Sequence, residues 1–131
     1  MKVSIIFFFC VLLMGVSIGS VAAMESSAIT GAVYCDHNNN GQLDNEEKGL
    51  ENIHVQIFIN KCGGTALQTI HTNKDGNFTF HGFDPNTYFI RSDVPCVCGG
   101  RMPTTNTCQK VVLREGETVV LPPFGYSEYG Q

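Results

Sequence analysis

Oxygen-bearing side chains recur at a regular spacing between residues 36 and 47. The segment reads Asp36-His37-Asn38-Asn39-Asn40-Gly41-Gln42-Leu43-Asp44-Asn45-Glu46-Glu47. Calcium is a hard cation that takes six to eight oxygen ligands. A twelve-position loop supplies them from positions one, three, five, seven, nine and twelve, with glycine at six. The pattern therefore predicts a calcium site whose ligands are Asp36, Asn38, Asn40, the backbone carbonyl of Gln42, Asp44 and Glu47.

The alternative interpretation of this segment is a polar turn, because Asn, Asp and Gly favour turns by themselves. Every ligand position and the glycine are occupied, so we favour the metal site. Three carboxylates and two neutral amides indicate a modest affinity, about 10⁻⁴–10⁻³ M as in extracellular modules. A β-rich segment precedes the loop and Gly49 follows it, so strands rather than helices flank it. We expect calcium to tie down a long connection, not to drive a sensor switch.

The first 23 residues have the features of a secretory signal peptide. Lys2 precedes an uncharged apolar run at residues 5–14, and the small residues Val21-Ala22-Ala23 follow. A membrane anchor is the alternative, but the run is short for a spanning helix of about 20 residues. We therefore expect a signal peptide at residues 1–23, a domain at residues 24–122, a flexible tail at residues 123–131, and a secreted, extracellular product.

The composition fits a single folded domain. Of 131 residues, 43% are hydrophobic and 15% are charged, which is too apolar for a disordered chain. The formal net charge is −4, and it becomes −5 when Lys2 leaves with the signal peptide. This acidic balance argues against electrostatic binding of nucleic acid.

Five cysteines remain after residue 23: Cys35, Cys62, Cys96, Cys98 and Cys108. An oxidising compartment favours their pairing. Because five is odd, at most two bridges form within the chain, and the remaining thiol is available for a disulfide-linked dimer. Cys96 and Cys98 point to one side of an extended segment, so each is expected to pair with a distant cysteine. The connectivity stays open at this point.

Alternating apolar and polar residues separated by turn residues predict an all-β sandwich or barrel. Strands are expected at residues 29–34, 53–59, 67–72, 77–81, 87–91, 110–113 and 118–121. A turn at Lys74-Asp75-Gly76 predicts a hairpin that pairs Ile70 with Phe80 and Thr72 with Phe78. The last two strands are expected to form a second hairpin, and residues 93–108 a cysteine-rich loop.

Several motifs occur in a characteristic order along residues 29–92. They are Ile29-Thr30-Gly31-Ala32-Val33-Tyr34, the calcium loop, Lys48-Gly49-Leu50-Glu51-Asn52-Ile53-His54-Val55, Thr72-Asn73-Lys74-Asp75-Gly76-Asn77-Phe78-Thr79-Phe80 and Gly82-Phe83-Asp84-Pro85-Asn86-Thr87-Tyr88. In this order they resemble the SdrD B-like (Cna protein B-type) domain family. The resemblance implies a seven-stranded prealbumin-like (Ig-like) β-sandwich, here braced by disulfides. It also implies calcium at the loop and a structural or adhesive role on cell surfaces.

The other reactive side chains form no catalytic pattern. The histidines are His37, His54, His71 and His81, and ordinary solvent-facing roles are favoured over a transition-metal site. No serine lies in a nucleophile elbow, and the thiols are expected in bridges, so we expect no enzyme. Asn77-Phe78-Thr79 makes Asn77 a glycosylation candidate, the alternative being an unmodified hairpin residue.

Two functional hypotheses follow from the sequence. The first is a secreted calcium-binding module with a structural or adhesive role outside the cell. The second is a secreted ligand-binding effector or defence protein whose loop at residues 93–108 contacts a carbohydrate or a receptor. The expected partner is an extracellular protein or glycan in both cases. The absence of Trp weakens the carbohydrate alternative.

Overall fold

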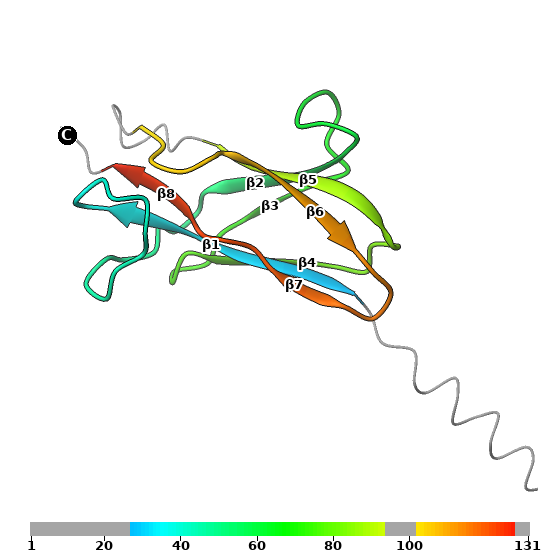
Figure 1. Cartoon of the computed structure of the whole chain (residues 1–131), viewed down its shortest axis with the longest axis horizontal. Coiled ribbons are helices and arrows are strands. Elements are labelled where there is room, and N and C mark those ends of the chain that lie inside the picture. Colours follow the sequence, from blue (N-terminus) through cyan, green and yellow to red (C-terminus); the bar gives the residue numbers. More distant parts are fainter. Residues whose placement is uncertain (1–26, 94–101, 128–131) are drawn as a thin grey trace, which may run out of the picture.

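The structure is a computed structural model that describes residues 27–93 and 102–127 (Figure 1). These residues form eight β-strands. The strands are β1 (Ala28–Asp36), β2 (His54–Ile59), β3 (Gln68–His71), β4 (Asn77–His81), β5 (Asn86–Ser92), β6 (Cys108–Leu113), β7 (Thr118–Val120) and β8 (Phe124–Ser127). The predicted all-β class is confirmed, with eight strands rather than seven. The described ranges contain no helix long and apolar enough to cross a bilayer.

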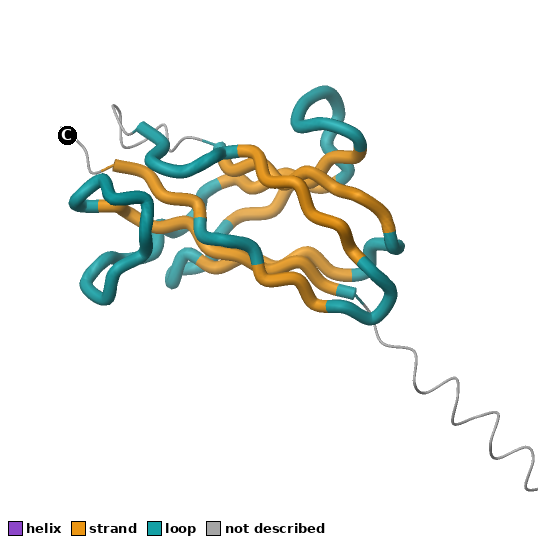
Figure 2. Tube along the Cα trace, in the orientation of Figure 1, coloured by secondary structure: helices purple, strands orange, loops and turns teal. Residues whose placement is uncertain are grey.

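The strands form a sandwich of two sheets (Figure 1 and Figure 2). One sheet has the order β4-β1-β7, with β8 also paired to β1, and the other has the order β3-β2-β5-β6. The long strand β1 is paired in parallel with β7 near its start and with β8 near its end. The other neighbouring strands are antiparallel. β1 therefore extends along the whole sheet, and its last residue, Asp36, lies at one end of the sandwich.

Apolar side chains from the inner faces of both sheets form the core. The buried members are Ile29, Val33, Ile53, Val55, Ile57, Phe78, Phe80, Tyr88, Ile90, Val111, Leu113, Leu121, Phe124 and Tyr126. In β2, Val55 and Ile57 are buried as their alternation predicts. Ile59, expected on the same face, is 38% exposed because the strand ends there, and Phe58 is buried instead.

The predicted hairpin between residues 67–72 and 77–81 is wrong. β3 pairs with β2 and β4 pairs with β1, so the turn at Lys74-Asp75-Gly76 carries the chain from one sheet to the other. Gly76 has a φ of 82°, the left-handed conformation that the turn was expected to need. Ile70 and Phe80 do face a common core, but from opposite sheets. Two alternating strands joined by a short turn bury the same side chains in both cases: when they pair with each other in one sheet, and when the turn connects two facing sheets.

The predicted second hairpin and the flexible tail are also corrected. β6 pairs with β5 in one sheet, whereas β7 pairs with β1 in the other. Residues 124–127, expected within the tail, form β8 and are all buried. Burial of the large side chains of Phe124 and Tyr126 offsets the entropy cost of ordering this segment. The predicted signal peptide at residues 1–23 and the end of the tail at residues 128–131 lie outside the described residues.

A disulfide braces the second sheet, as expected. Cys62, in the connection after β2, is bonded to Cys108 at the start of β6, with their Cα atoms 6.2 Å apart. Because β5 lies between β2 and β6, the bond ties the β2–β3 connection to the far edge of this sheet. Cys35 is buried on β1. Cys96 and Cys98 lie outside the described residues.

Candidate metal centre

The candidate calcium loop, residues 36–47, leaves the end of β1, and the chain then returns to the same strand. The N–H of Cys35 donates to the carbonyl of Lys48 at 2.9 Å, and the N–H of Leu50 donates to the carbonyl of Val33 at 2.8 Å. Tyr34 and Gly49 form an antiparallel bridge between these two bonds. Both ends of the loop are therefore fixed against β1.

Close backbone packing holds the return segment in place. A Cβ atom at Gly49 would overlap the carbonyl group of Asp75, so no larger residue fits here without a shift. The neighbouring Gly76 lies against Gly49, and its carbonyl accepts the N–H of Val33 at 2.8 Å. The turn between β3 and β4 thus supports the end of the candidate calcium loop.

Hydrogen bonds inside the loop organise the first three predicted ligands. Asp36 accepts the N–H of Asn40 at 3.2 Å through Oδ1 and that of Gly41 at 2.7 Å through Oδ2. Asn38 Oδ1 also accepts the N–H of Asn40, at 3.2 Å. Asn40 Oδ1 accepts the N–H of Gln42 at 2.9 Å. Gly41 has the positive φ, 75°, that position six requires.

The last two predicted carboxylate ligands close the loop. Asp44 Oδ2 accepts the side-chain amides of Asn38 at 3.1 Å and Asn40 at 3.0 Å. Glu47 accepts the N–H of Asp44 through Oε1 and that of His37 through Oε2, both at 2.9 Å. Residues that are three to ten positions apart are therefore joined within the loop by hydrogen bonds to Asp44 and Glu47.

The carboxylates of the loop affect the neighbouring Tyr34. Burial, followed by the charges of Asp36, Glu47 and Asp44, raises the pKa of Tyr34 to about 12. The Tyr34 hydroxyl is buried and has no hydrogen-bond partner within the described residues. The three carboxylates thus concentrate negative charge at the end of β1, which favours a cation there.

Asp36 is fully buried, and its charged form is stabilised by hydrogen bonds. Burial raises the pKa of this carboxyl group, but the Thr104 hydroxyl and the backbone N–H groups of Gly41 and Asn40 outweigh it. The pKa of Asp36 therefore lies below its usual value of 3.8. A carboxylate that stays ionised near neutral pH is a suitable ligand for a hard cation.

The loop supplies oxygen atoms of the kind that calcium takes, although the described residues contain no group of three acidic, histidine or cysteine side chains placed to hold a metal ion. A hollow of about 430 Å³ is lined by His37, Asn38, Asn40, Asp44, Asn45, Glu46 and Glu47. It thus includes four of the six predicted ligands, whereas Asp36 is buried and Gln42 lines a neighbouring pocket. Carboxylate and amide oxygens predominate, and these are the ligands that calcium prefers.

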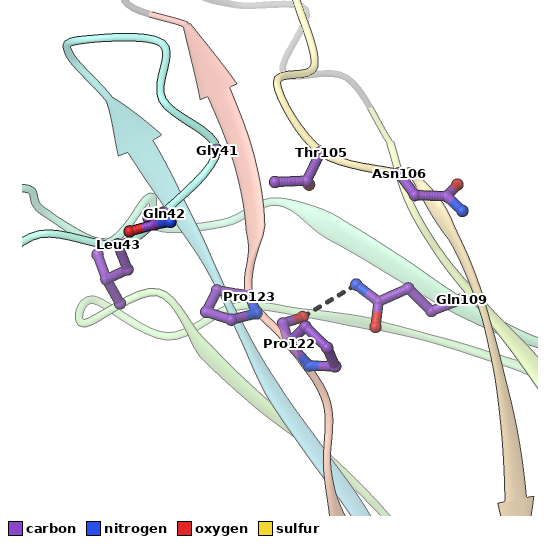
Figure 3. Close-up of a pocket in the computed structure, with 8 residues that line it drawn as sticks. All are labelled: Gly41, Gln42, Leu43, Thr105, Asn106, Gln109, Pro122 and Pro123. Atoms are coloured by element: carbon purple, nitrogen blue, oxygen red, sulfur yellow. Dashed lines mark hydrogen bonds between the residues drawn. The ribbon is translucent and has the colours of Figure 1, made fainter.

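A second pocket, of about 560 Å³, lies beside the loop (Figure 3). Its lining residues are Gly41, Gln42, Leu43, Thr105, Asn106, Gln109, Pro122 and Pro123. The side-chain amide of Gln109 donates to the carbonyl of Pro122 at 2.9 Å and joins two of its walls. Leu43, 47% exposed, contributes an apolar wall. The side chains that line this pocket are uncharged amide, hydroxyl and apolar groups.

The fold also shows where the glycosylation candidate Asn77 and the strand histidines lie. Asn77 begins β4 and is exposed, so its side chain is accessible on the surface and its glycosylation stays a prediction. His71 and His81, which a β3–β4 hairpin would put on one face, lie in different sheets. His71 instead lies opposite His54 of β2.

Sequence reasoning missed the supporting residues of the candidate metal centre. Thr104 comes from a segment 68 positions further along the chain, and its hydroxyl lowers the pKa of Asp36, while Tyr34 lies directly before the loop on β1 and its hydroxyl is buried. No local pattern marks Thr104, and the motif that contains Tyr34 gives no sign of a role beside the loop. Gly49 did carry a signal, since a glycine soon after the loop is compatible with a close backbone approach.

The sequence profile of the SdrD B-like domain family matches residues 27–111, and this chain belongs to that family. Serine-aspartate repeat-containing protein D of Staphylococcus aureus strain Newman is 35% identical over 63 residues, which are 48% of this chain and 5% of that protein. The same protein from strain MW2 is also 35% identical over 63 residues, which are 48% of this chain and 4% of the relative. The chain therefore matches a small part of the length of these relatives.

Solved structures with the same fold include two pilins. The minor pilin GBS52 of Streptococcus agalactiae superimposes with a TM-score of 0.57 and 10% identity, over 82% of this chain and 47% of the pilin. The shaft pilin SpaA of Lactobacillus rhamnosus GG gives a TM-score of 0.56 and 12% identity, over 81% of this chain and 52% of the pilin. At this identity the likeness establishes the β-sandwich fold alone.

Proposed function

We propose that this chain is a secreted, calcium-binding β-sandwich module with a structural or adhesive role outside the cell. The observation that carries the proposal is the candidate calcium loop at the end of β1. Its carboxylate and amide groups are already drawn together by hydrogen bonds to one another and to the loop backbone. The backbone that carries these groups is thus already folded into a closed loop, and a cation would replace the side-chain bonds from Asn38 and Asn40 to Asp44 by bonds to oxygen.

Calcium at this loop would act on stability rather than on catalysis. The connection between β1 and β2 runs over residues 37–53, and its return segment is fixed by backbone bonds to Val33 and Cys35. Ligands from the start and the end of the loop would hold its remaining part in one conformation. Such a site would stiffen one end of the sandwich, a useful property in a module that transmits force or presents a surface.

Membership in the SdrD B-like domain family supports a structural or adhesive role. The solved structures with the same fold are named as a minor pilin and a shaft pilin, and a structural part for the present sandwich agrees with those names. On this proposal the chain is not an enzyme, and its partner is an extracellular protein or glycan. The predicted signal peptide supports secretion.

A calcium-dependent melting curve tests the proposal. Calcium should raise the melting temperature of the chain, because a ligand that binds only the folded state stabilises it by linkage. At a concentration 100 times its Kd the gain is about 2.7 kcal/mol, or roughly 10 °C or more for a domain of this size. Magnesium serves as the control cation, since it demands a tighter octahedral site. An unchanged melting temperature in calcium would contradict the proposal.

One observation favours the second candidate function, the binding of an uncharged ligand. The pocket beside the calcium loop includes Thr105 and Asn106 from the cysteine-rich segment, together with Gln109. Amide and hydroxyl groups next to an apolar wall suit a neutral carbohydrate. A glycan array would test this function with the Asn106→Ala variant as comparison. Binding that disappears in this variant supports the function, and the absence of binding to any neutral glycan excludes it.

A further inference from the structure

We propose that His54 and His71 form a second cation site, for a divalent transition metal such as Zn²⁺ or Cu²⁺, with Asp93 orienting His54. The site lies on the outer face of the β3-β2-β5-β6 sheet. It uses none of the residues of the calcium loop, and it does not depend on the proposed function. The chemistry also differs, because imidazole nitrogen suits zinc and copper whereas carboxylate oxygen suits calcium.

Strand pairing places the three side chains in one row. His54 of β2 lies directly opposite His71 of β3 in the antiparallel register. On the other side of β2, Val55 is paired with Ser92, so the next residue, Asp93, lies opposite His54. The N–H of Asp93 donates to the carbonyl of His54 at 3.0 Å, which confirms this alignment. Residues opposite each other on neighbouring strands point to the same face of a sheet.

The two imidazole rings are close enough to share one ion. Their centroids are 4.3 Å apart, in an edge-to-face arrangement. Zinc binds imidazole nitrogen at about 2.0–2.1 Å, so two ligating nitrogens lie about 3 Å apart. Opposed residues on neighbouring antiparallel strands have Cβ atoms about 4.5–5.5 Å apart, and at this spacing the proposal needs only rotation of the two exposed side chains. Within the described residues neither ring makes a hydrogen bond that would have to break.

Asp93 is placed to orient His54 from behind. Asp93 Oδ2 lies 4.0 Å from Nδ1 of His54, which leaves Nε2 of that ring for the metal. This separation is longer than a hydrogen bond, and a small rotation of the exposed ring would let Nδ1–H donate to Oδ2. A carboxylate bonded to the non-ligating nitrogen fixes the ring and increases the basicity of the ligand. Arg91 Nε lies 3.6 Å from the other oxygen, Oδ1, and thus keeps Oδ2 directed toward His54.

The site is open to solvent. The side chain of His54 is 55% exposed and that of Asp93 is 42% exposed, and His71 is exposed as well. Two protein ligands leave the remaining coordination positions of a zinc ion for water or for a donor from another molecule. The row is therefore suited to reversible capture of a metal rather than to a closed structural site.

Calorimetric titration of ZnCl₂ into the untagged chain, saturated with calcium, tests the proposal. We expect one zinc ion per chain. His54→Gln and His71→Gln should each abolish this binding, because a single exposed imidazole holds zinc weakly. Asp93→Asn should weaken it about tenfold, as removal of an orienting carboxylate does in other metal sites.

His81→Gln is the matched control, because His81 is an exposed strand histidine of the other sheet. This variant should bind zinc like the parent chain. The melting temperature of each variant without zinc should equal that of the parent, since all four side chains are exposed or partly exposed. Absence of zinc binding in the parent, or full binding in His71→Gln, would overturn the proposal. Either result leaves the response to calcium unaffected, so the two sites are tested separately.

Discussion

Glu47 and His37 are joined by a hydrogen bond of 2.9 Å from the backbone N–H of His37 to the carboxylate of Glu47. The bond connects the last position of the candidate calcium loop to its second position. It brings the carboxylate of Glu47 next to the residue that follows Asp36, so the two ends of the ligand set meet. The loop is therefore closed by its own side chains, and a cation would add to this closure.

The closure predicts the effect of neutralising Glu47. Glu47→Gln keeps an oxygen that can accept the His37 N–H, but it removes a charge and bidentate coordination. We expect calcium affinity about tenfold lower, because affinity in such loops follows the number of charged ligands. Calorimetry with CaCl₂ measures the change. Glu115→Gln, in the exposed turn between β6 and β7, has the same charge change and should bind calcium normally. Equal affinities in the two variants would exclude Glu47 as a ligand.

The packing of Gly49 predicts a large loss of stability in Gly49→Ala. The added Cβ overlaps the backbone of Asp75, so the return segment of the loop has to move. We expect a cost of about 3 kcal/mol or more in the free energy of unfolding, measured by urea denaturation. Gly64→Ala is the comparison, because its Cβ meets no atom within 4 Å and only its φ of 76° is unfavourable. That variant should lose about 1 kcal/mol. The prediction fails if Gly49→Ala is the more stable of the two.

The disulfide predicts a stability that depends on oxidation. Cys62 and Cys108 are separated by 46 positions, and closure of such a loop restricts the unfolded chain. The double variant Cys62→Ser with Cys108→Ser should unfold with about 2–5 kcal/mol less free energy than the parent. Peptide mapping under non-reducing conditions checks the pairing itself. Recovery of Cys62 joined to a cysteine other than Cys108 would contradict the structure.

Tyr126 predicts a pH dependence of stability on the alkaline side. Its buried hydroxyl donates to the backbone carbonyl and to Oγ of Ser92, both at 3.0 Å. Burial raises the pKa of Tyr126 above 10.0, and the negative charge of Asp93 raises it further. The hydrogen bond to Ser92 lowers this pKa, but by less than burial raises it. Because the raised pKa belongs to the folded state, the stabilisation is complete below pH 10 and is lost as the pH rises further.

The Tyr126→Phe variant measures this contribution. At pH 7 it should lose about 1–3 kcal/mol, since a buried hydrogen-bonded hydroxyl is removed and Ser92 loses its partner. Above pH 10 the difference between parent and variant should shrink, because only the parent titrates at this position. Urea denaturation at several pH values measures both the loss of stability at pH 7 and the change in the difference above pH 10. A difference that stays constant through the alkaline range would show that the ionisation of Tyr126 is not linked to folding.

The candidate calcium loop was predictable because its information is local. Its twelve contiguous residues contain the ligands and the glycine, and the hydrogen bonds within it join residues at most ten positions apart. The strands were also predictable, since alternation depends on a side chain and its immediate neighbours. The effect of Thr104 on the pKa of Asp36 depends on the tertiary fold, and no local pattern encodes it.

Strand pairing was not predictable in the same way. The turn at residues 73–76 has the chemistry of a hairpin, yet it connects β3 and β4 in different sheets. That error hid the contact between His54 and His71, which exists only because β3 pairs with β2. β8 was missed because its four residues, preceded by two prolines, show no long alternation. Its stability comes from pairing with β1, about 90 positions away in the chain.

Direct calcium binding is the central claim of this account, and calorimetry on the purified chain tests it most directly. After removal of bound metal with a chelator, CaCl₂ should bind with one ion per chain and a Kd of about 10⁻⁴–10⁻³ M. The Asp36→Asn variant, which keeps the size of the side chain but not its charge, should bind much more weakly. The absence of binding at about 10 mM calcium, or equal binding by Asp36→Asn, would contradict the account.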